Sequence, residues 1–156
     1  TKVLNVTHGD AVFYHTFLEY GPYAGEIGTR QNGAMISMST DKAVAYALGT
    51  LQERGQLFVA PGTECYEGML VGERSKPGDM VVNIAKTKNL GNQRSSTADI
   101  AVQLTPPKTF TLEEALEYIM DDELVEVTPQ NIRMRKRILN ETDRRKWRVR
   151  NGMVDK

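Results

Sequence analysis

The chain has 156 residues, a mass of 17.5 kDa and 40% hydrophobic residues, which is enough to bury the core of one domain. No apolar run approaches the roughly 20 residues that a membrane span needs, and the N-terminus lacks a signal-peptide pattern. A single cysteine, Cys65, excludes an internal disulfide and fits a reducing, cytoplasmic compartment. We expect Cys65 to be a small buried strand residue.

The net charge of zero conceals a strong asymmetry along the chain. Residues 1–130 hold 10 Lys and Arg against 17 Asp and Glu (10 − 17 = −7), whereas residues 131–156 hold 10 against 3 (10 − 3 = +7). A basic segment of this kind favours a polyanionic partner. A solvated helix and tail would explain the charge equally well.

The first half of the chain alternates strand and helix patterns. Period-two alternation predicts a strand at 10–20, followed by a turn at 21–25 and a short strand at 33–39. A helix capped by Ser39 or Thr40 is then predicted to run to Arg54 and to stop at Gly55. Its apolar face comprises Val44, Ala47, Leu48 and Leu51.

Three strands are predicted next. The segment 56–60 has the pattern of a buried strand. The segments 65–73 and 80–85 are expected to pair as a hairpin, because the intervening 75–79 contains the Pro and Gly typical of turns.

The second half of the chain has clear start and stop signals. Thr111 and Glu114 form a capping box that begins a helix, and a strand at 124–127 ends at Thr128-Pro129. The segment 131–139 alternates like a strand, and a last helix is expected after Asn140. The apolar face of the capped helix comprises Leu112, Ala115, Leu116, Ile119 and Met120.

A polar, basic segment at 86–99 separates two apolar runs. Its charged residues are three cations and Asp99, and it contains little that could pack in a core. Long loops without secondary structure are uncommon in compact domains and are usually functional or disordered. We therefore expect a flexible loop that contacts a negatively charged partner through Lys86, Lys88 and Arg94.

The search for catalytic groups is negative. There is no phosphate-binding Gly-x-x-x-x-Gly-Lys motif, and one cysteine with two histidines does not make a zinc site. His15 is expected to be a packed or edge histidine. The acidic run at 121–123 is expected to be a solvated turn. Nothing in the sequence therefore predicts an enzyme.

Two basic features favour binding instead. Arg133, Arg135 and Arg137 are predicted to lie on one strand face, roughly 6–7 Å apart, close to the spacing of successive phosphates. The alternative is a solvent-facing row that pairs with the acidic helix residues Glu113, Glu114 and Glu117. In the last helix, Trp147 either stacks on a base or anchors the helix.

Several segments together resemble the BipA/TypA translational GTPases, and the resemblance covers nearly the whole chain in register. The longest runs are 111–119, 121–129 and 132–137, and 143–145 resembles the family's basic C-terminus. The other matching segments are 25–33, 42–48, 51–55, 62–69 and 104–107.

The resemblance implies a fragment of a longer protein. Residues 1–20 correspond to the closing helix and strand of a preceding elongation-factor-G-like domain, with a helix end at 1–7 and Gly9 as its stop. Residues 21–140 correspond to the family-specific C-terminal domain, and 141–156 to a basic helix and tail. GTP and Mg²⁺ would belong to a GTPase domain outside this chain, so we expect no cofactor and no catalysis here.

The resemblance also implies a partner. The family acts on the bacterial ribosome in large-subunit assembly and stress adaptation, and its C-terminal domain contacts ribosomal RNA and the acceptor end of the A-site tRNA through a loop. Gly91 and Gln93 depart from the family's loop pattern. The implied loop contacts are Lys86, Lys88, Asn89, Asn92 and Arg94, and the further candidates are Arg133, Arg135, Arg137, Arg144 and Arg145.

The predicted fold is α+β, with a mixed, mostly antiparallel sheet or barrel-like core, two to three helices and a long basic loop. The predicted function is a ribosome- and tRNA-binding module. The alternative is a protein-interaction or interdomain docking module without RNA contact.

Overall fold

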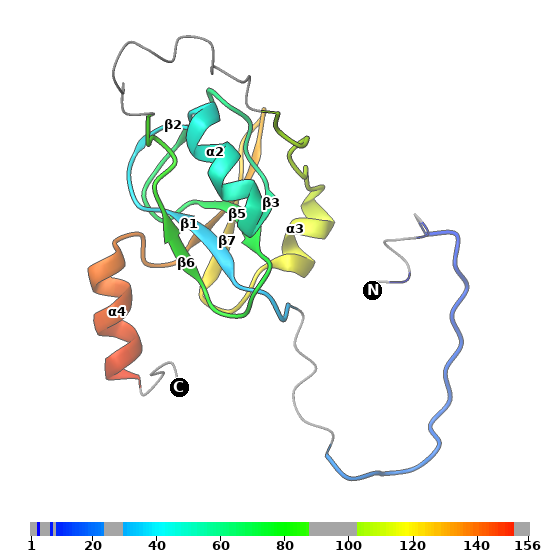
Figure 1. The fold of residues 1–156 in the computed structure, drawn as a ribbon. Coiled ribbons are helices and arrows are strands. Elements are labelled where there is room, and N and C mark those ends of the chain that lie inside the picture. Colours follow the sequence, from blue (N-terminus) through cyan, green and yellow to red (C-terminus); the bar gives the residue numbers. More distant parts are fainter. Residues whose placement is uncertain (1–2, 4–6, 8, 24–29, 88–102, 152–156) are drawn as a thin grey trace, which may run out of the picture.

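A four-stranded sheet forms the centre of the computed structural model, which describes residues 3, 7, 9–23, 30–87 and 103–151 (Figure 1). The strand order is β3-β5-β1-β6, and β1 is buried along its whole length. Strand β1 is antiparallel to β5 and parallel to β6. The strands are β1 (Ala34–Ser37), β3 (Gly55–Leu57), β5 (Leu70–Arg74) and β6 (Met80–Val82).

Two smaller sheets and three helices complete the α+β fold in the described part of the chain. The paired strands are β2 (Asp41–Lys42) with β4 (Glu64–Cys65), and β7 (Glu123–Val127) with β8 (Ile132–Lys136). The helices are α2 (Ala45–Leu51), which continues into the 3-10 turn η1 (Gln52–Arg54), α3 (Leu112–Tyr118) and α4 (Glu141–Arg150). The mixed, mostly antiparallel sheet was predicted, whereas the strands of the described residues form no closed barrel.

The central sheet is covered on both faces. One face packs in a cluster that includes Met35, Leu48 and Val71, with α2 on this side (Figure 1). The other face packs Ile36 and Leu70 against Ala115 of α3 and Met134 of β8. Burial on both faces explains why β1 lacks a polar alternation. Cys65 is buried in the first cluster, as predicted, and its burial raises the pKa of the thiol to about 11.

The predicted hairpin of β5 and β6 is wrong, because β1 lies between these two strands. The connection 75–79 crosses the start of β1, where the amide of Gly33 donates to the carbonyl of Lys76. A Cβ atom at Gly33 would lie 1.8 Å from the carbonyl oxygen of Gly78. A glycine before β1 therefore permits the crossing, a long-range effect that turn composition does not predict.

The predicted start of the first helix is also wrong. Residues 41–42 pair with β4, the amide of Ala43 donates to the carbonyl of Thr63, and Val44 is the N-cap of α2. Pairing with a distant strand thus displaces the local capping signal. By contrast, α3 has the predicted capping box between Thr111 and Glu114. Its predicted apolar face is only partly buried, since Leu116 is 56% exposed.

The predicted strand at 10–20 is not formed. The described segment 9–23 is extended and almost wholly exposed, and Figure 1 shows it outside the folded body. His15 is exposed rather than packed. Val3 is helical and accepts from the amide of Thr7, and Gly9 has a φ of 88°. The other residues of the expected helix end at 1–7 lie outside the described residues. A strand needs a partner, and the described chain provides none for this segment.

Candidate nucleic-acid interface

The predicted loop contacts begin at Lys86, which is exposed just after β6. Lys88, Asn89, Asn92 and Arg94 lie outside the described residues. Lys86 makes no hydrogen bond or ion pair through its side chain within the described chain. Its charge is therefore available to a partner.

The predicted arginine row is divided by the structure. Arg133 and Arg135 share one face of β8, as alternation requires. The Nε atom of Arg135 lies 2.5 Å from a carboxylate oxygen of Glu126, and the Tyr66 hydroxyl donates to the other oxygen at 2.5 Å. Arg135 therefore pairs across the β7–β8 ladder, not with the acidic residues of α3, and its charge is already neutralised.

Arg133 and Arg137 are the two arginines of this row whose side chains have no partner in the described chain. Neither side chain makes a hydrogen bond or ion pair within the described chain. Arg137 lies beyond the end of β8 and is exposed, whereas Arg133 is half-buried. They line two separate concavities, so they present single cations on different parts of the surface rather than one row.

The arginines of α4 also have different environments. The helix begins at the N-cap Asn140, whose side chain accepts from the amide of Asp143. Arg144 is 7% exposed, and its guanidinium donates to the carbonyls of Ile138 and Leu139. Burial lowers the pKa of Arg144. Its neighbour Arg145 is exposed and makes no such bond in the described chain.

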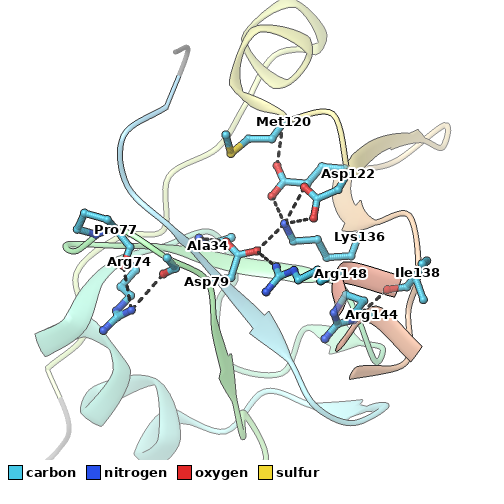
Figure 2. Close-up of polar contacts among 12 residues, drawn as sticks. Ala34, Arg74, Pro77, Asp79, Met120, Asp122, Lys136, Ile138, Arg144 and Arg148 are labelled. Carbon is cyan, nitrogen blue, oxygen red and sulfur yellow. Dashed lines mark hydrogen bonds and ion pairs between the residues drawn. The ribbon is translucent and has the colours of Figure 1, made fainter. Parts of the chain in front are cut away.

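The most extensive polar site was not predicted. Six side chains from five parts of the chain form a group that we call the buried ionic network. Figure 2 shows Asp79, Asp122, Lys136 and Arg148 of this group. At its centre, Lys136 is 1% exposed, and its Nζ atom lies 2.6–3.0 Å from three carboxylates. The members are Arg30, Asp79, Asp122, Glu123, Lys136 and Arg148.

Two of the three carboxylates in the buried ionic network, Glu123 and Asp79, have further partners. Glu123 accepts both terminal nitrogens of Arg30, at 2.7 and 3.1 Å, as well as the amide of Met120. Asp79 accepts the amide of Ala34 at 2.9 Å and lies 3.1 Å from Arg148. The charges of its three acidic and three basic side chains cancel. The network therefore has no net positive charge that could attract a phosphate.

The pKa shifts in the network follow from these partners. Burial disfavours each charged form, but the carboxylates around Lys136 outweigh burial and raise its pKa above 10.5. Burial likewise opposes ionisation of Asp79, yet the charge of Lys136 and the amide of Ala34 hold its pKa below 3.8. Both groups are therefore charged at neutral pH.

The prediction of a solvated acidic turn at 121–123 is wrong for two of its three residues. Glu123 is 3% exposed, and Asp122 bonds Lys136. The signal for this site was present on β8, because alternation places Lys136 on the same inward face as Met134. A cation on an inward face needs carboxylate partners.

The described residues show neither a metal-binding cluster nor a membrane-spanning helix. They contain no group of three His, Cys, Asp or Glu side chains arranged to hold a metal ion. None of their helices is long and apolar enough to cross a membrane.

The chain is similar to bacterial proteins of one family. A family model described as the TypA/BipA C-terminal domain matches residues 32–141. The large ribosomal subunit assembly factor BipA of Escherichia coli (strain K12) is 50% identical over 147 residues, which cover 94% of this chain and 24% of that protein. Its counterpart in Buchnera aphidicola is 48% identical over 157 residues, covering 99% and 26%. The chain therefore spans about a quarter of the length of these curated relatives.

Proposed function

Because the chain belongs to the TypA/BipA family and matches its C-terminal domain, we propose that it is the ribosome-binding module of a cytoplasmic GTP-binding assembly factor. The relatives are named large ribosomal subunit assembly factors. The proposed partners are large-subunit RNA and the acceptor end of the A-site tRNA. Catalysis, with GTP and Mg²⁺, belongs to a GTPase domain outside this chain.

The observation that supports RNA binding is the division of cations between the interior and the surface. Lys136, Arg30 and Arg148 are paired inside the buried ionic network, and Arg135 is paired with Glu126. What remains is a set of surface cations with no ion pair within the described chain, which is the requirement for phosphate contacts. Among the predicted contact residues this set comprises Lys86, Arg133, Arg137 and Arg145, which we call the uncommitted cations.

The polar segment that follows Lys86 is the proposed RNA-reaching element. Lys88, Asn89, Asn92 and Arg94 add two cations and two amide side chains within nine residues of Lys86. Amide and cationic side chains provide the donors that contact phosphates and base edges. We propose that this segment supplies the main contact and that the other uncommitted cations supply a weaker one.

A salt titration tests this proposal. The 156-residue chain should bind large ribosomal subunits and tRNA with an affinity that falls steeply with salt. A triple alanine variant at Lys86, Lys88 and Arg94 should lower the slope of log K against log salt by about 3, roughly one unit per phosphate contact. The matched control removes three exposed lysines elsewhere and should leave the slope nearly unchanged: Lys42→Ala, Lys76→Ala and Lys146→Ala.

A second function is favoured by the exposed apolar residues of α3. Leu112 and Leu116 lie one turn apart and are exposed, and Met120 continues the stripe beyond the helix. A docking module that packs against other domains of the parent protein would use such a stripe. Salt-insensitive binding to those domains, with no binding to ribosomal subunits or tRNA, would favour docking and contradict the RNA proposal.

A further inference from the structure

A pocket of about 550 Å³ lies between α4 and the two segments 120–122 and 137–138. Its volume falls within the roughly 300–1,000 Å³ typical of small-molecule sites. Two of its residues, Asp122 and Arg148, belong to the buried ionic network. The others are Met120, Asp121, Arg137, Ile138, Arg144 and Trp147.

The pocket combines an aromatic wall with guanidinium groups. Trp147 on α4 is 37% exposed, and Met120 and Ile138 add apolar surface. Arg137 makes no ion pair within the described chain. In Arg144, the Nη2 atom is buried and has no hydrogen-bond acceptor among the described residues.

The charge that is free to act on a ligand is positive. Asp122 is bound to Lys136, and Arg148 is bound to Asp79, so these two residues are committed to the network. The remaining charged residues of the pocket are two cations, Arg137 and Arg144, and one carboxylate, Asp121, which makes no ion pair in the described chain. The pocket therefore favours a ligand with one anionic group, a flat ring and acceptor atoms.

A nucleotide has these three properties. Unpaired bases stack on aromatic side chains and guanidinium planes, and their phosphates bind Arg. We propose that this pocket holds one unpaired nucleotide of the RNA partner, with its base against Trp147 and its phosphate at Arg137. This proposal rests on the proposed function and specifies the chemistry of a site that lies apart from the 86–99 segment.

Trp147 provides a direct measurement, because it is the single tryptophan of the chain. Its fluorescence should be quenched saturably when a short single-stranded RNA is added to the 156-residue chain. An abasic oligonucleotide of the same length, which retains the phosphates, should bind without this quenching. A blunt RNA duplex should not quench, since its bases remain stacked on one another.

Variants separate a binding role from a structural one. Measured by the anisotropy of labelled single-stranded RNA, Trp147→Leu should weaken binding about tenfold, within the range that base–aromatic stacking provides. Trp147→Phe should restore most of the affinity, because a benzyl ring still stacks. Arg137→Ala should lower the salt slope by about 1, whereas Arg150→Ala, an exposed residue of α4 outside the pocket, should have the smaller effect.

The outcomes separate this proposal from the broader one. Salt-dependent binding of RNA without quenching of Trp147, and with equal affinities for Trp147→Leu and Trp147→Phe, would overturn the pocket and leave RNA binding intact. Absence of any binding to RNA or large subunits would overturn both. Equal quenching by a polyglutamate peptide that competes with RNA would show an acidic-peptide site and would also overturn the nucleotide proposal.

Discussion

Within the basic segment 131–156, cations of the buried ionic network and uncommitted cations lie close together in sequence but have opposite environments. Lys136 and Arg137 are adjacent, yet Lys136 is held by three carboxylates in the interior, while Arg137 is exposed without an ion pair in the described chain. Arg144 and Arg145 repeat the contrast on α4. A run of positive charge therefore consists of two populations, one that stabilises the fold and one that is available to a partner.

The physical reason is the cost of burying a charge. A cation leaves water only if carboxylates and hydrogen bonds replace its hydration. The network meets this requirement by drawing acids from β7, from the turn before it and from the residue before β6. The following predictions test the comparison through the stability of the fold, from the largest effect to the smallest.

Removing the central cation should have the largest effect. Lys136→Met would leave Asp79, Asp122 and Glu123 facing one another without a shared counterion. Breaking a buried pair in this way costs about 3–5 kcal/mol, a large share of a typical stability of about 5–15 kcal/mol. Urea denaturation followed by circular dichroism measures the change, and the matched control Arg137→Met should stay within about 0.5 kcal/mol of the original chain.

Removing the buried arginine of α4 should have an intermediate effect. Arg144→Met keeps most of the apolar stem but leaves the carbonyls of Ile138 and Leu139 without their donor. We expect a loss of about 1–3 kcal/mol in the free energy of unfolding. The neighbouring change Arg145→Met should have little effect on stability, and equal losses from the two variants would contradict the assignment of Arg144 to the interior.

The network should also make the free energy of unfolding decrease at acidic pH. The folded-state pKa of Asp79 lies below 3.8, so its stabilising contribution is complete above that pH and is lost as the pH falls through the lower, folded-state value. The variant Asp79→Asn should be less stable than the original chain at pH 7, and the difference should narrow below about pH 3.8. Denaturation curves at pH 7, 4 and 3 measure it, and a constant difference across this range would show that Asp79 is not held ionised by its partners.

The surface population should contribute least to stability. Arg133→Ala combined with Arg137→Ala should change the free energy of unfolding by no more than about 0.5 kcal/mol per site. The same double variant should lower the salt slope of RNA binding by about 2. Unchanged binding together with lost stability would place these two arginines in the structural population instead.

Local signals predicted the elements that depend on local interactions. The capping box at Thr111 and Glu114, the strand β7 and the start of α4 after Asn140 were all predicted and are formed. Each depends on hydrogen bonds or alternation within a few residues. The family was also identified correctly, because motif residues keep their order along the chain.

The errors concern interactions between distant segments. The hairpin of β5 and β6 was wrong because β1 inserts between them, and the first helix begins late because residues 41–42 pair with β4. The segment 10–20 has the alternation of a strand but no partner in the described chain. Turn composition and local caps contain no information about which strand lies alongside.

By itself, the sequence determined the family, the α+β class and the strand alternation at 131–139 that places Arg133 and Arg135 on one face. Only the tertiary structure decided that Asp79, Asp122 and Glu123 converge on Lys136, and that Arg135 is paired with Glu126 and Arg144 is held by backbone carbonyls, while Arg133, Arg137 and Arg145 have neither kind of partner in the described chain. The reason is that alternation sets the direction of a side chain through the local backbone. Whether its charge is neutralised depends on carboxylates that the fold brings from far along the chain.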